Sequence, residues 1–117
     1  MSLDPTALLL KKMAQVFPGE DPPSILSILD QYGVLPYERE RRRVQLAILK
    51  LSEGSLDRLR QSVADAKRDY RDVLAWAEYP NETRTSISDI QKMRPETVKR
   101  IRAADRAQYL EWLNSDA

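Results

Sequence analysis

One apolar pattern between residues 55 and 79 constrains the fold more than any other feature of this chain. Apolar residues recur there at alternating spacings of three and four, at Leu56, Leu59, Val63, Ala66, Tyr70, Val73 and Ala77. That spacing is an a/d heptad seam, which predicts an amphipathic helix with one face packed against other helices. Ser55 supplies an N-cap and Pro80 a stop, so we expect one long helix over residues 55–79.

Proline residues mark the starts of further helices. At residues 4–5 and 21–22 an aspartate N-cap precedes a proline at the first helical position. Pro36 opens a third helix, which we expect over residues 37–51. Its second half, residues 44–51, is apolar on nearly every side, and a helix that is apolar all round is a buried one. We therefore expect residues 44–51 at the centre of the core.

The last third of the chain predicts a loop followed by a C-terminal helix. Residues 80–86 are polar and read as a loop, and Pro95 opens a helix over most of the remaining chain. Asp105 falls inside the apolar stripe of that helix, and we place it at an exposed edge. If it were buried, it would need Arg102 or the Tyr109 hydroxyl as a partner. No segment alternates with the period of a strand, so we expect a single all-α domain, a compact bundle of five to six helices.

Histidine and cysteine are absent from the 117 residues, and the three glycines stand far apart. The chain therefore lacks the usual zinc ligands, a thiolate nucleophile and the glycine-rich loops that bind phosphate. We expect no catalytic residues, no cofactor and no small-molecule substrate. The lack of cysteine suits a reducing compartment, and no apolar stretch approaches the ~20 residues that span a bilayer, so we expect a cytoplasmic protein that does not bind membranes.

Three aspartates lie on one face of the expected long helix, nearly opposite the heptad seam. Asp65, Asp69 and Asp72 are spaced four and three residues apart, and aligned carboxylates could hold Mg²⁺. No matching acidic pair lies on a neighbouring helix, whereas hard cations need ligands from more than one element. We favour a solvated face in which Arg68 pairs with these carboxylates, and a Mg²⁺-dependent phosphohydrolase is our third hypothesis.

Two aromatic residues, Trp76 and Tyr79, fall on the same acidic side of the expected long helix. Exposed aromatic residues could anchor a partner, because Trp, Tyr and Arg dominate interface hot spots. We favour the alternative, in which another helix covers this end of the long helix, because large aromatic residues are usually buried.

Arginine is concentrated just before the expected core segment, at Arg39, Arg41, Arg42 and Arg43. The C-terminal helix is also rich in basic residues, and a basic surface could bind phosphate backbones. Over the whole chain, 19 basic residues nearly balance 18 acidic ones, whereas proteins that bind DNA usually carry a clear basic excess. A nucleic-acid-binding regulator is therefore our second hypothesis.

Two stretches between residues 37 and 80, YERERRRVQLAILKLS and DYRDVLAWAEYP, give the chain a family resemblance. It resembles small uncharacterised bacterial all-helical proteins. That resemblance implies a helical fold and no particular activity.

The first functional hypothesis is a non-catalytic protein–protein interaction module or a self-associating helical module. A helix as long as residues 55–79 is about twice the usual length, so shorter helices would leave part of its seam uncovered. Uncovered apolar surface favours a partner, and a two-fold homodimer is the commonest arrangement. Tyr70 and Val63 would then lie at the dimer interface.

Overall fold

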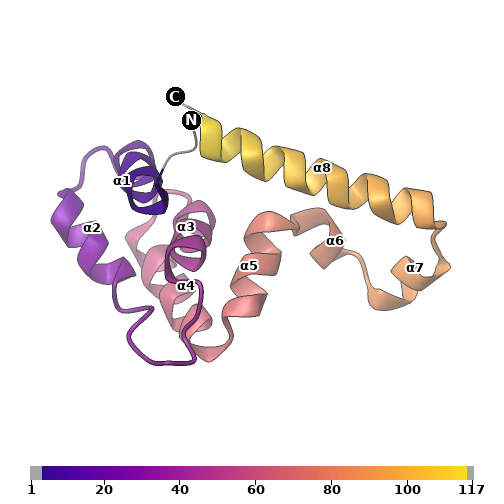
Figure 1. Ribbon diagram of the computed structural model, residues 1–117, viewed down its shortest axis with the longest axis horizontal. Coiled ribbons are helices and arrows are strands. Elements are labelled where there is room, and N and C mark those ends of the chain that lie inside the picture. Colours follow the sequence, from indigo (N-terminus) through magenta and orange to yellow (C-terminus); the bar gives the residue numbers. More distant parts are fainter. Residues whose placement is uncertain (1–3, 116–117) are drawn as a thin grey trace.

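The computed structural model describes residues 4–115, with the exception of the Ile87 side chain, and it is all-helical over that range (Figure 1). The helices are α1 (Pro5–Val16), α2 (Pro22–Leu29), α3 (Arg41–Ser52), α4 (Leu56–Arg68), α5 (Tyr70–Glu78), α6 (Pro80–Arg84), α7 (Ile87–Lys92) and α8 (Pro95–Asn114). The predicted all-α class is confirmed. The arrangement of five to six helices around one long helix is not.

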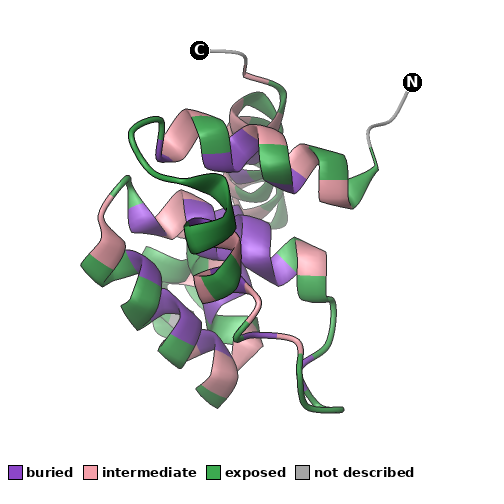
Figure 2. Cartoon of the chain, turned by 90° about the vertical axis from the view of Figure 1, so that its left-hand side faces the viewer, coloured by how far each residue is buried: buried purple, intermediate pink, exposed green. Residues whose placement is uncertain are grey.

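Helix α3 occupies the central position, because α1, α4 and α5 all pack against it. Every side chain from residue 44 to residue 49 is buried, whereas Lys50 and Leu51 are half-buried. In Figure 2 the buried residues, coloured purple, alternate along the helices with exposed residues, coloured green. The prediction that this segment forms the centre of the core is confirmed, since a helix that is apolar all round must be covered all round.

The expected long helix is interrupted at Asp69, so α4 and α5 are separate helices. Asp69 has an extended backbone (φ −158°, ψ 102°), and its side chain accepts a hydrogen bond from the backbone N–H of Arg71. Aspartate favours such caps because its carboxylate competes with the helical backbone for N–H groups. The single helix over residues 55–79 is therefore a wrong prediction. The heptad pattern crosses the break because α3 packs against both α4 and α5.

Helix α3 also begins later than expected, at Arg41 instead of residue 37. Glu40 takes the left-handed conformation (φ 52°), which stops the helix from extending backwards. Residues 30–40 connect α2 to α3, and Gly33 within this loop has a positive φ of 102°.

Helix α6 replaces the polar loop predicted for residues 80–86. Asp105 of α8 is fully buried against it, where it accepts hydrogen bonds from the backbone N–H groups of Asn81 and Glu82 and from the Asn81 side chain. A carboxylate here pairs N–H groups that have no partner inside their own helix. The exposed position predicted for Asp105 is wrong, and neither Arg102 nor Tyr109 is its partner; Arg102 pairs with Glu82 instead.

The C-terminal end of α8 is joined to α1 by a buried lysine. Lys12 donates hydrogen bonds to the carbonyl oxygens of Trp112 and Ser115 and to Gln15, and its ammonium lies 4.8 Å from the centre of the Trp112 ring. A cation is favourable at this end of a helix, because the last carbonyl groups carry partial negative charge. The other end of α8 extends with α7 beyond the main body (Figure 1).

The central position of α3 predicts a large effect for truncation of Ile48, which is fully buried. Ile48→Ala should lower the free energy of unfolding by about 2–5 kcal/mol, because it leaves a cavity as well as losing apolar burial. Chemical denaturation checks this, with Leu10→Ala on the exposed side of α1 as a control of similar size that should change stability far less. A loss below about 1 kcal/mol for Ile48→Ala would contradict the central position of α3.

Candidate functional site

Of the three aspartates considered as metal ligands, Asp65 and Asp69 are used in local contacts, whereas Asp72 is exposed. Asp65 accepts hydrogen bonds from Gln61 and Arg68, at 3.0 and 3.4 Å. Asp69 caps α5 and pairs with the Arg71 side chain, a hydrogen bond that lowers the pKa of the Asp69 carboxyl. Within residues 4–115, no three acidic side chains come together as a cation site. The break at Asp69 also removes the continuous helical face on which the aspartates were expected to align.

The two aromatic residues of the acidic face have different surroundings. Trp76 is 38% exposed, so the expected covering helix does not bury it. Tyr79 is half-buried and lines a hollow with Glu82 and Arg102. Their exposure therefore differs, and Trp76 is the more accessible of the two.

The residues expected at a dimer seam lie mostly inside the chain. Val63 is buried in the core, and α3 packs against the helix that carries it. Tyr70 is half-buried at the start of α5, where it lines a hollow beside Tyr37. The seam is therefore covered within the chain, and Val63 is not available to a second copy.

The arginines that begin α3 are paired with acidic side chains. Arg41 and Arg42 both contact Asp30, at 2.8 and 3.3 Å. Arg43 donates two hydrogen bonds to Glu78 and one to Glu40, and the Glu78 contact is the main reason that the pKa of Arg43 is raised. These three side chains do not form an uncompensated basic surface.

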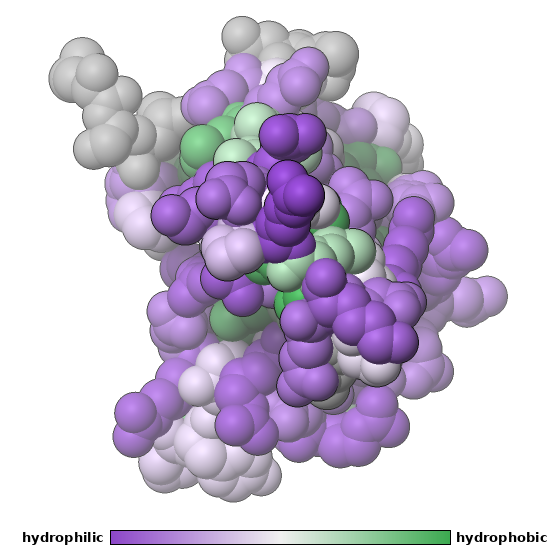
Figure 3. All heavy atoms as spheres, turned by 90° about the vertical axis from the view of Figure 1, so that its right-hand side faces the viewer, coloured by the Kyte–Doolittle hydropathy of each residue, from purple (hydrophilic) through white to green (hydrophobic). Residues whose placement is uncertain are grey.

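The basic residues of α8 lie mainly on the part of the helix that extends from the body. Figure 3 looks onto this end of the molecule, and hydrophilic residues cover most of that face. Arg102 is paired with Glu82 at 2.8 Å, whereas Lys99, Arg100 and Arg106 are exposed. This surface is charged, and Arg106 lines the same hollow as the paired arginines of α3, whereas Lys99 and Arg100 do not.

Four consecutive apolar residues are exposed in the loop that precedes α3. We call residues 34–37 the apolar loop; they are Val34, Leu35, Pro36 and Tyr37. Val34 is 71% exposed and Tyr37 is 62% exposed. Runs of exposed apolar residues are unfavourable in water unless something else covers them.

The backbone of the apolar loop is held by one buried carboxylate. One oxygen of Glu38 accepts hydrogen bonds from the N–H groups of Gly33, Val34 and Leu35, at 2.9, 3.0 and 3.4 Å. Its other oxygen accepts a hydrogen bond of 2.9 Å from Lys67 on α4. Burial alone would raise the pKa of Glu38, but these hydrogen bonds outweigh it and lower the pKa below its usual range.

A second hydrogen bond fixes the backbone on the C-terminal side of the apolar loop. The Tyr32 hydroxyl donates a hydrogen bond of 2.7 Å to the carbonyl oxygen of Arg39. Burial is the main cause that raises the pKa of Tyr32 to about 12, so the hydroxyl keeps its proton near neutral pH. The apolar loop is thus displayed on a backbone fixed from both sides.

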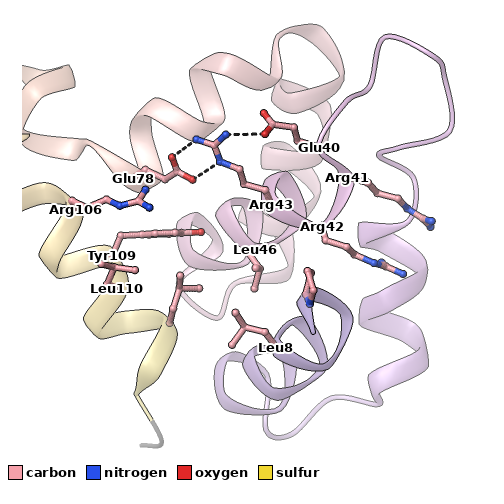
Figure 4. Close-up of a pocket in the computed structure, with 12 residues that line it drawn as sticks. Leu8, Glu40, Arg41, Arg42, Arg43, Leu46, Glu78, Arg106, Tyr109 and Leu110 are labelled. Carbon is pink, nitrogen blue, oxygen red and sulfur yellow. Dashed lines mark hydrogen bonds and ion pairs between the residues drawn. The ribbon is translucent and has the colours of Figure 1, made fainter. Parts of the chain in front are cut away.

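A cleft opens between α1, α3 and α8, with a volume of about 590 Å³ (Figure 4). We call it the α3–α8 cleft. One part is apolar and the other carries charged side chains. Its lining residues are Pro5, Leu8, Glu40, Arg41, Arg42, Arg43, Leu46, Glu78, Arg106, Tyr109, Leu110 and Leu113.

Tyr109 has an unusual position in the α3–α8 cleft. Its ring is stacked on Trp112 with 5.7 Å between the ring centres, and the residue is only 4% exposed. The hydroxyl oxygen is buried and has no hydrogen-bond partner among the described residues. Burial, followed by the charge of Glu78, raises the pKa of Tyr109, so the hydroxyl remains a neutral donor.

Comparisons with protein-family models, with curated proteins and with solved structures find no match for this chain. None of the helices within residues 4–115 is both long enough and apolar enough to cross a bilayer. The function must therefore be argued from the apolar loop and the α3–α8 cleft.

Sequence reasoning missed both of these features, for different reasons. The apolar loop had a signal, since Val-Leu-Pro-Tyr directly follows Gly33, and Gly33 and Pro36 both disfavour the interior of a helix. The cleft had none, because its lining residues come from four helices and from residues as far apart as Pro5 and Leu113.

The contacts of Glu38 predict a pH-dependent contribution to stability. Glu38→Gln should lower the free energy of unfolding by about 1–3 kcal/mol at pH 7, since it removes a charged acceptor from several hydrogen bonds. The folded-state pKa is lowered, so this contribution is complete above the unfolded pKa of about 4.3 and is lost as the pH falls through the folded value. Denaturation of both proteins from pH 7 to pH 3 checks this. A difference between wild type and variant that stays constant below pH 4 would contradict it.

Proposed function

We propose that this protein is a non-catalytic protein–protein interaction module that contacts its partner through the apolar loop. The observation that carries the proposal is the exposure of four consecutive apolar residues at positions 34–37. Exposed apolar patches of this kind are typical of binding surfaces. Tyrosine in particular is enriched among the residues that dominate binding energy, and Tyr37 is the largest side chain of the loop.

The fixed backbone of the apolar loop supports this proposal. Association loses affinity when a loop must be ordered on binding, and a loop that is already ordered avoids that loss. Glu38 and Tyr32 hold residues 33–39 before any partner arrives. Such a loop can present Val34 and Tyr37 in one defined geometry.

The surface next to Tyr37 also suits an interface. A hollow of about 240 Å³ lies between Tyr37 and the junction of α4 and α5, and it is lined by Lys67, Arg68, Asp69, Tyr70 and Arg71 as well. Interfaces commonly combine a buried apolar centre with a charged and polar rim. The apolar loop would supply the centre of the interface, and this hollow would supply part of its rim. Tyr70 would then lie at that rim and not at the dimer seam predicted from the sequence.

The non-catalytic part of the proposal rests on the state of the acidic groups. A general acid or base works best with a pKa near the operating pH. The pKa values of Glu38 and Asp69 are both lowered by hydrogen bonds, away from neutrality. Both carboxylates also accept hydrogen bonds from backbone N–H groups, so each has a structural role.

The partner tested first is a second copy of the chain, because two-fold homodimers are the commonest oligomers. Light scattering of the wild type should give about twice the 13.5 kDa of one chain. The double variant Val34→Ser, Tyr37→Ser should give 13.5 kDa, because it removes the apolar contact without touching the buried Glu38. Leu10→Ser is the matched control, because Leu10 is an exposed apolar residue of α1 outside the apolar loop. This variant should remain dimeric.

A monomeric wild type would leave a different protein as the partner, and a photo-crosslinking residue in place of Tyr37 tests that case in cells. We expect one defined protein to be captured from position 37 and not from Leu10, with capture prevented by excess wild type but not by the double variant. A monomer with no crosslink specific to position 37 would disprove the proposal.

A further inference from the structure

We propose that the α3–α8 cleft is a binding site for a small molecule with an apolar body and a single carboxylate at one end. This site is distinct from the apolar loop, and the inference does not depend on the proposed protein–protein interaction. Its volume of about 590 Å³ lies within the range of small-molecule sites, which are concave and largely apolar with a few polar groups.

The apolar part of the cleft can receive the body of such a molecule. Leu8 of α1, Leu46 of α3 and Leu110 of α8 approach it from three helices (Figure 4). Leu110 is 42% exposed although it faces a concave surface. Covering these side chains with an apolar ligand is favourable, because it removes apolar area from water on both partners.

The charged part of the cleft favours an anion. Four arginines and two glutamates line it, which leaves two excess positive charges among the lining residues, and Asp30 beside Arg41 and Arg42 offsets one of them. Arg43 is already held by Glu78 and Glu40. Arg106 makes no ion pair with any described residue, and it is therefore the cation left for a ligand.

The Tyr109 hydroxyl is the second, independent sign of a ligand. It is a buried donor without an acceptor in the described chain, and such groups usually have a partner. Figure 4 shows this hydroxyl directed from α8 toward α3, at the inner side of the cleft. A carboxylate oxygen would supply the missing acceptor. The hydroxyl is covered in the free protein, so this contact requires the cleft side chains to shift on binding.

A monocarboxylate fits these groups better than a phosphate or a cation. One unpaired guanidinium and one neutral hydroxyl match the charge and the two oxygens of a carboxylate. A doubly charged phosphate would lie close to Glu40 and Glu78 without a second unpaired arginine to offset the repulsion. A cationic group would face Arg106, because the two glutamates are already occupied by Arg43.

Titration with decanoate and with decanol, below the concentrations at which they aggregate, tests the proposal. Binding is measured by calorimetry and located by backbone amide shifts. Decanoate should bind about tenfold or more tightly than decanol, which has the same chain without the charge, and the shifts should fall on α1, α3 and α8. From hexanoate to decanoate, the affinity should rise up to about fourfold for each added CH₂ group.

Three variants assign the polar contacts. Arg106→Gln should remove the preference for decanoate over decanol, whereas Arg100→Gln, an exposed arginine of α8 outside the cleft, should keep it. Tyr109→Phe keeps the ring and removes only the hydroxyl. It should weaken decanoate several-fold, leave decanol unchanged and not lower the melting temperature, because the free protein loses an unpaired buried group.

Three results would overturn the proposal. The first is no saturable binding of decanoate at millimolar concentration. The second is equal affinity for decanoate and decanol, which would mean an apolar cleft without recognition of the anion. The third is an equal effect of Arg106→Gln and Arg100→Gln, which would reduce the role of Arg106 to its contribution to net charge. None of these outcomes would affect the interaction proposed for the apolar loop, since residues 34–37 do not line the cleft.

Discussion

Helix α3 has no face left for solvent between residues 44 and 49, and the helices around it must therefore cover it from every side. This requirement also places both candidate surfaces. The residues just before α3 form the apolar loop, and its first turn carries Arg41, Arg42 and Arg43 to the α3–α8 cleft. A change that disrupts the packing of other helices around α3 would therefore displace the α3–α8 cleft and the apolar loop together.

The eight helices described within residues 4–115 have many ends, and each end leaves backbone groups without a partner inside the helix. Buried polar side chains from other elements supply several of these partners. Gln45 of α3 donates to the carbonyl oxygen of Leu29, the last residue of α2, Asp105 of α8 accepts from the start of α6, and Lys12 of α1 donates near the end of α8. A buried polar group is tolerated when it is hydrogen-bonded, so these residues belong to the core as much as the leucines do.

Local signals in the sequence predicted what depends on neighbours along the chain. The caps at Asp4, Asp21 and Ser55 and the apolar segment in α3 are of this kind, and the structure confirms them. The break at Asp69 was missed because the heptad pattern continues across it, and periodicity does not record a cap inside a helix. Asp105 was misplaced because its partners lie more than 20 residues away, on a helix that the sequence predicted as a loop. The apolar loop and the cleft depend on which elements meet, and helical periodicity does not specify that.

Native-state hydrogen exchange tests the central position of α3 most directly, because it gives a free energy of opening for each amide. We predict that the amides of residues 44–49 exchange only when the whole molecule unfolds, with an opening free energy equal to the global value from denaturation. The amides of α7, which extends from the body, should exchange through much smaller openings. If residues 44–49 instead exchanged well below the global value while α1 or α8 remained protected, α3 would not be the element around which this protein is built.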